Sequence, residues 1–186
     1  MRFFLRLLPL LPLGWIAYRF SMELPEDPFV YLMTWTGYPA LFLLMATVAV
    51  TPLYRLTRIN LYKVRRYIGL WSFAYGFLHL AAYFFLELEG SAALLADSLA
   101  KRPYIFLGGG ALAILTAMAV TSIPALFRRY RSIHRLVDLA ALLIIVHVSM
   151  AQKRMDLADM TLDAAFLALL ALRFFLRRNR GNPAFR

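Results

Sequence analysis

The chain has 186 residues, of which 62% are hydrophobic and 17% charged, and its formal net charge is +11. This balance lies outside that of soluble globular domains and indicates an integral membrane protein. The absence of cysteine excludes disulfides, cysteine-held iron–sulfur clusters, thioether-attached haem and thiol catalysis. The basic residues stand in short clusters between apolar runs, so we interpret them as topology signals and set nucleic-acid binding aside.

Apolar runs of the length needed to cross a bilayer, about 20 residues, recur along the chain. They lie at residues 3–20, 28–54, 67–86, 103–127, 133–152 and 161–176. The second, third and fourth runs are uncharged, whereas the others are shorter or contain charges. The first resembles a signal peptide, but no small-x-small cleavage site follows it, so we interpret it as an uncleaved span. The sequence predicts an all-α bundle of six transmembrane helices in one domain, residues 1–186.

Lysine and arginine are distributed unevenly between the two sides of this six-helix arrangement. One side comprises residues 1–6, 55–66, 128–135 and 173–186, and it holds 16 of the 21 basic residues. The other side holds five basic residues and nine of the ten acidic ones. By the positive-inside rule, both termini are predicted to be cytoplasmic.

The three histidines, His79, His134 and His147, all lie in or at the ends of two predicted spans, 67–86 and 133–152. A membrane-embedded imidazole suggests a functional role, because an unpartnered polar ring in hydrocarbon costs several kcal/mol. The alternative is a structural histidine whose ring is hydrogen-bonded to a neighbouring helix. Thirteen residues separate His134 from His147, a rise of roughly 20 Å. His79 is thirteen residues beyond Arg66 in a span of the same direction, so we expect His79 and His147 at matching depth.

Thirteen steps of 100° also leave His134 and His147 on different faces of a straight helix. Either the helix is locally irregular, or two cofactors approach it from different sides. Two neutral imidazoles at one depth suit the axial ligation of a b-type haem. A zinc or copper centre fits less well, because neither a cysteine nor a third histidine or carboxylate is expected at that depth.

At the inner depth, the position opposite His134 is taken by Arg65 and Arg66. These arginines could act as topology signals or contact a haem propionate or a flavin. Asp138 follows His134 by four residues and could orient its ring; it could equally pair with Arg135 or Arg66. The residues alone leave these alternatives open.

Several motifs resemble those of the MsrQ family, also called YedZ, within the ferric-reductase-like transmembrane group. They are "VTPL" (50–53), "RRYIGLWSFAYGFLHLAAY" (65–83), "KRPYIFLGG" (101–109), "VTS" (120–122) and "IHRLVDLAALLIIVH" (133–147). The resemblance, over about residues 35–155, implies a cytochrome b domain of the bacterial cell inner membrane. Such a subunit passes electrons from the quinone pool, or from a flavin, to MsrP, a periplasmic molybdenum enzyme that repairs oxidised methionines.

The resemblance further implies that His79, His134 and His147 ligate one or two haem b groups, and that FMN is a second cofactor. Related oxidases carry another histidine where this chain has arginine, which leaves the ligand opposite His134 open. No glycine-rich phosphate loop or dinucleotide domain marks a flavin site. The subunit would deliver electrons and would not itself reduce methionine sulfoxide. The alternatives are a small transporter or proton pathway, with Asp138 in the relay, and a passive membrane anchor.

Overall fold

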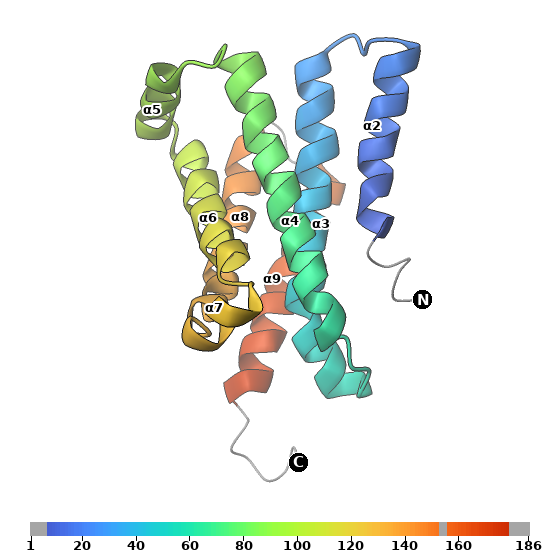
Figure 1. Ribbon diagram of the computed structural model, residues 1–186, viewed down its shortest axis with the longest axis vertical. Helices are drawn as coiled ribbons and strands as arrows, with labels where there is room; N and C mark the ends of the chain where they lie inside the picture. Colours follow the sequence, from blue (N-terminus) through green and yellow to red (C-terminus); the bar gives the residue numbers. More distant parts are fainter. Residues whose placement is uncertain (1–6, 153–155, 179–186) are drawn as a thin grey trace.

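A computed structural model describes residues 7–152 and 156–178, and this part of the chain is helical. The α-helices are α2 (Leu11–Met22), α3 (Pro28–Thr57), α4 (Tyr62–Ala82), α5 (Ala92–Lys101), α6 (Pro103–Val120), α7 (Pro124–Arg129), α8 (Val137–Ala151) and α9 (Leu157–Arg178). Two 3-10 turns, Leu8–Leu10 and Ile133–Leu136, precede α2 and α8, and a π-helical turn, Tyr83–Glu87, continues α4. The long helices run alternately up and down beside one another (Figure 1).

Four helical segments of the described chain are long and apolar enough to cross a membrane. They are Pro28–Thr57, Tyr62–Glu87, Pro103–Val120 and Ile133–Ala151. These segments correspond to the second to fifth predicted spans and fit the prediction of an all-α membrane protein. The first predicted span lies partly outside the described residues, and its described helix, α2, has 12 residues. The sixth corresponds to α9, which has 22 residues but carries several charges, so the count of six stays a prediction.

Two local boundaries differ from those expected from hydropathy. The run 103–127 is not one span, because α6 ends at Val120 and α7 begins at Pro124. The hydroxyls of Thr121 and Ser122 donate back to the carbonyls of Ala117 and Met118, and Pro124 has no N–H to continue the ladder. Between α4 and α6, the expected loop contains α5, which the Ser91 side chain caps by accepting the Leu94 N–H.

The two ends of the bundle differ in charge. The C-terminal ends of α3 and α9, the start of α4 and helix α7 meet at one end (Figure 1), which we call the basic end because the arginine clusters at 55–66, 128–135 and 173–178 lie there. The α2–α3 connection and α5 lie at the opposite, acidic end, with Glu23, Asp27 and Asp97. The predicted topology likewise places the basic clusters at one end of the bundle and most acidic residues at the other.

The main core is shared by α3, α6, α8 and α9. Its buried residues are Leu41, Leu44, Val48, Leu115, Val137, Ala140, Ala141, Ile145 and Phe166. Ala140 and Ala141 on α8 are fully buried, and their small side chains let neighbouring helices approach α8 closely. This packing fixes α8 against α3 and α6. It therefore fixes the position along the bundle axis of the residues in the second half of α8.

Candidate functional site

His79 lies in the second half of α4 with its ring against α3. Its Nδ1 is 3.2 Å from the carbonyl oxygen of Met33 and 3.3 Å from the hydroxyl oxygen of Thr36. The Thr36 hydroxyl donates its own hydrogen to the Leu32 carbonyl at 2.6 Å. Because both neighbouring oxygens then accept, Nδ1 carries the ring hydrogen and Nε2 keeps a free lone pair.

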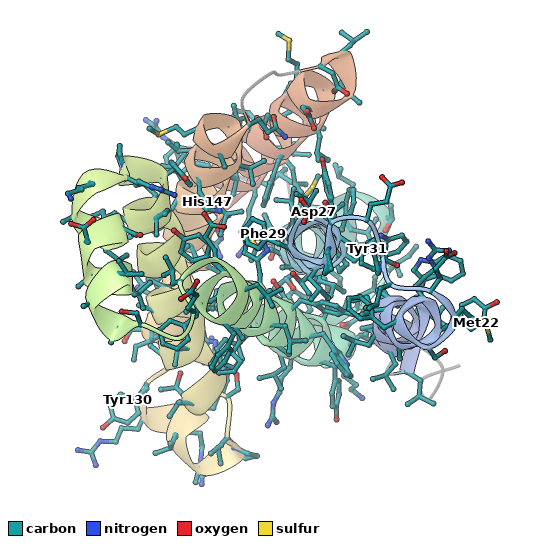
Figure 2. The ribbon with its side chains drawn as sticks, turned by 90° about the horizontal axis from the view of Figure 1, so that it is seen from above. Met22, Asp27, Phe29, Tyr31, Tyr130 and His147 are labelled. Atoms are coloured by element: carbon teal, nitrogen blue, oxygen red, sulfur yellow. The ribbon has the colours of Figure 1, made fainter. Side chains whose placement is uncertain are left out.

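His147 has the same arrangement on α8. Its Nδ1 donates to the carbonyl oxygen of Tyr104 at 2.7 Å, in the first turn of α6. Viewed along the bundle, His147 lies on the inner side of α8 (Figure 2). A backbone carbonyl can only accept, so the Nε2 of His147 is also the unprotonated nitrogen.

Glycine stands where each histidine ring meets the neighbouring helix. A Cβ added to Gly37 of α3 would lie 3.0 Å from the Cε1 of His79, and one added to Gly108 of α6 would lie 2.8 Å from the Nδ1 of His147. Real Cβ atoms essentially never approach as closely as the contact at Gly108, so a side chain there would displace the His147 ring; at Gly37 the contact would be tight, and the His79 ring would have to shift slightly. Neither glycine was identified from the sequence as part of the site, although Gly108 belongs to the triplet "GGG" at 108–110.

The structure brings His79 and His147 together, as their expected equal depth predicts. Their ring centroids are 6.4 Å apart, and the ring planes are nearly perpendicular at 88°. Both rings are half-buried. Within residues 7–152 and 156–178, no group of three or more His, Cys, Asp or Glu residues could hold a metal ion. The pair is therefore the part of the described chain best suited to an iron held by two imidazoles.

His134 lies apart from this pair, in the 3-10 turn Ile133–Leu136. Whether the helix between His134 and His147 is locally irregular was left open by the sequence. The 3-10 turn is such an irregularity. The Nε2 of His134 is 3.3 Å from the hydroxyl oxygen of Thr121, which donates to Ala117 at 2.7 Å and so accepts from the histidine. The ring of Phe127 packs against His134 with centroids 4.9 Å apart.

The chain between α3 and α8 matches a known family. Residues 32–148 fit the family described as "Ferric reductase like transmembrane component". The chain belongs to the ferric-reductase-like transmembrane family. A curated relative from Cronobacter sakazakii (strain ATCC BAA-894), named protein-methionine-sulfoxide reductase heme-binding subunit MsrQ, is 38% identical over 177 residues, which cover 91% of this chain and 88% of the relative. No solved structure matches the chain significantly.

The ferric-reductase-like segment contains all three histidines together with Arg65 and Arg66. Arg65 is half-buried and lies within range of charge–charge interaction with His134 and Asp138. Arg66 is exposed. Of the two arginines, Arg65 is therefore the one placed to act on the surroundings of His134.

Helix α9, outside the ferric-reductase-like segment, supplies the partners of Asp138. The expectation that Asp138 faces His134 or pairs with Arg135 or Arg66 is wrong. Its carboxylate instead forms an ion pair with the Arg173 Nε at 2.8 Å and a second with the guanidinium of Arg177. Arg173 and Arg177 are one helical turn apart on α9 and reach Asp138 together.

Arg173 is buried, with 1% of its surface exposed. Its Nη1 donates to the Val48 carbonyl at 2.6 Å and to the Thr51 hydroxyl at 3.2 Å. It therefore joins α9 to α3 as well as to Asp138 of α8. From the sequence alone, Arg173 is interpreted as a topology signal. Its role as a buried partner of Asp138 could have been inferred because each is a charged residue inside an otherwise apolar run.

Proposed function

We propose that this chain is a membrane haem b electron-transfer subunit, in which His79 and His147 would together hold one haem iron. The observation that supports this most directly is the separation of the two rings. Iron–nitrogen bonds of about 2 Å and a ring radius of about 1 Å place the centroids roughly 6 Å apart. The distance in the structure is 6.4 Å.

The surrounding residues suit this role. Haem bound here would supply a one-electron carrier that alternates between ferric and ferrous iron. The carbonyls of Met33 and Tyr104 accept the Nδ1 hydrogens, which fixes the tautomer of both rings and makes each Nε2 a stronger donor to iron. Gly37 and Gly108 let α3 and α6 approach closely enough for these bonds to form.

The finer features are also part of the proposal. The whole chain, residues 1–186, is then one cytochrome b domain of six spans in the bacterial inner membrane, with both termini cytoplasmic. It takes electrons from the quinone pool, or from FMN, and delivers them to the periplasmic molybdenum reductase MsrP. The separation of basic and acidic ends supports the orientation, and the name of the Cronobacter relative supports the assignment to methionine-sulfoxide repair.

His134 is the proposed ligand of a second, inner haem. Arg65 is placed to offer a positive charge to a propionate of that haem, and Arg66 is a weaker candidate because it is exposed. Ligation through the Nε2 of His134 would require its bond to Thr121 to break, whereas ligation through Nδ1 would leave that bond intact.

The direct test is haem content. Protein purified from haem-replete cells should show a Soret band that shifts and sharpens on reduction with dithionite. A pyridine haemochrome assay then gives the number of haems per chain, and His134→Ala should remove only the second haem if one is bound. A colourless preparation of correctly inserted protein would contradict the proposal.

Gly108 provides a test of the ring's packing that leaves all histidines in place. In Gly108→Ala, the new Cβ would lie 2.8 Å from the Nδ1 of His147, so the ring must move away from Tyr104. We expect a shifted Soret band and reduced haem content, with overpacking that costs about 1–3 kcal/mol of folding free energy.

The matched control is Gly110→Ala on the same helix, where the nearest atom, on Leu143, is 3.8 Å from the added Cβ. This control should keep the haem spectrum of the wild type. Equal spectra for the two variants would show that His147 is not held as the structure describes.

A further inference from the structure

Three arginine side chains gather at the basic end of the bundle, where the start of α4 and the end of α9 lie near each other (Figure 1). They are Arg65 of α4 and Arg173 and Arg177 of α9. Arg65 is within range of charge–charge interaction with both α9 arginines and with Asp138 of α8. Asp138 in turn pairs with both α9 arginines. We call these four residues the arginine cluster.

The arginine cluster carries more positive charge than the chain's own acidic side chains can neutralise. Asp138 supplies one carboxylate against three guanidinium groups. The other nine Asp and Glu residues of the sequence lie at 23–27, 87–97 and 156–163, in the acidic half. Charges that are partly withdrawn from water are normally paired. An anion from outside the chain would therefore complete the cluster.

Arg65 and Arg177 are the members of the cluster that can reach such an anion. Arg65 is half-buried, yet the ion pairs within the described residues are two that join Asp138 to α9 and one on α5, so Arg65 is in none of them. Arg177 pairs with Asp138 but keeps 38% of its side chain exposed. Arg173 is buried and already donates to α3.

Apolar side chains lie exposed one helical turn inward from the charged ones on both α8 and α9. Leu142 follows Asp138 by four residues, and Phe174 precedes Arg177 by three. Both Leu142 and Phe174 are exposed. Residues three or four apart share a helix face, so each charged group continues toward the middle of the bundle as apolar surface. A charged headgroup followed by hydrocarbon fits this surface.

We propose that the arginine cluster binds the phosphate of an anionic phospholipid, with Arg65 and Arg177 donating to its oxygens and an acyl chain lying along Leu142 and Phe174. A guanidinium group binds phosphate oxygens through paired N–H donors. Basic pockets between transmembrane helices are known sites for anionic headgroups. A zwitterionic lipid suits the cluster less well, because the arginines repel its ammonium group.

The bound lipid would connect two helices that differ in their relation to the proposed haem. Helix α4 carries His79, whereas α9 lies outside the ferric-reductase-like segment. Both helices pack against α3, and a phosphate held by Arg65 and Arg177 would bridge them across the end of α3. The site goes beyond the proposed function and does not require a bound haem.

Affinity is tested by native mass spectrometry of the full-length protein in micelles. Wild-type protein should bind dioleoylphosphatidylglycerol more tightly than dioleoylphosphatidylcholine. Arg65→Gln should weaken the binding of phosphatidylglycerol about fivefold, which is the contribution of one arginine to an anionic headgroup. This variant breaks no ion pair of the described residues, so it should fold. Arg177→Gln should weaken binding similarly.

The matched controls are the neighbouring arginines. Arg66→Gln and Arg178→Gln each remove the same charge one position along the same helix, and both residues are exposed. These variants should keep the affinity for phosphatidylglycerol within about twofold, because exposed charges are screened by salt. Equal losses in Arg65→Gln and Arg66→Gln would show a general attraction of the basic end and overturn the site. Equal affinity of the wild type for the two lipids would overturn it as well.

Two further arms distinguish the lipid from other phosphate or carboxylate anions. Millimolar inorganic phosphate should not displace phosphatidylglycerol, because it has no acyl chain to bury; displacement would overturn the lipid as occupant. The proposed inner haem would offer propionates to Arg65, so His134→Ala, which should remove that haem, should bind phosphatidylglycerol as the wild type does. Binding that appears only in His134→Ala would assign the cluster to a propionate and overturn the proposal.

Location is tested by crosslinking with phosphatidylglycerol that carries a diazirine in one acyl chain. Labels mapped by mass spectrometry should lie on α8 near Leu142 or on α9 near Phe174. Labels confined to other helices would overturn the proposed position of the chain. A colourless preparation that still binds the lipid in this way would contradict only the proposed haem function, and a haem-loaded protein without this binding would contradict only the lipid site.

Discussion

Replacing His147 with alanine is expected to remove the haem proposed to lie between α4 and α8 and, under the proposed function, to stop electron delivery to the partner reductase. The reason is that His79 alone would be left to hold the proposed haem, and that the Tyr104 carbonyl would lose its donor. His79→Ala should have the same effect from the other side. The measurement is Soret absorbance per protein, with quinol-driven reduction of methionine sulfoxide as the functional readout.

The control for these variants is His134→Ala, which lies outside the pair and should retain the same haem. Membrane insertion is checked by the yield and monodispersity of the purified protein. If His147→Ala kept its full haem content, the bis-histidine assignment would be wrong. If it kept partner activity without haem, the chain would be a passive anchor.

The second large effect concerns stability. Asp138→Ala leaves the buried Arg173 without its anionic partner, and an uncompensated buried charge typically costs about 3 kcal/mol or more. Because the Asp138 side chain is 35% exposed, we expect a loss near the lower end, about 3 kcal/mol. The measurement is the free energy of unfolding in mixed micelles under increasing denaturant.

A double-mutant cycle separates this ion pair from general packing. Arg173→Leu removes the buried charge and leaves Asp138 with Arg177, so it should destabilise the protein less than Asp138→Ala. The double variant should then be more stable than Asp138→Ala alone, because no buried charge remains. Additive losses in the two single variants would show that the pair does not couple.

The sequence was sufficient to predict the features that the bilayer imposes, namely helix formation and the depth of each residue. In lipid the backbone must satisfy its own hydrogen bonds, so long apolar runs become helices, and a constant rise of 1.5 Å per residue converts spacing into depth. That is why His79 and His147 could be matched before their contact was known. Rotation about the helix axis is less predictable, because one 3-10 turn at Ile133–Leu136 changes the face on which His134 lies.

The partner of Asp138 could not be predicted for a different reason. The candidates from sequence, Arg66 and Arg135, were chosen because they are near in the chain or expected at the same depth. The actual partners, Arg173 and Arg177, come from α9, and their choice depends on how α9 packs against α3 and α8. Lateral packing in a bundle has no counterpart in hydropathy, since lipid and a neighbouring helix are equally apolar.

The histidine rings are carried by α4 and α8 but are oriented by carbonyls of α3 and α6. In the proposed haem site, the strength of the bond from His147 to Tyr104 would affect how well its Nε2 donates to iron, and ligand basicity is one of the properties that set a haem's reduction potential. Tyr104 lies in the first turn of α6, directly beyond α5 at the acidic end. A small displacement of that turn, such as a docked protein could cause, would change the driving force for electron transfer without moving either ligand-bearing helix.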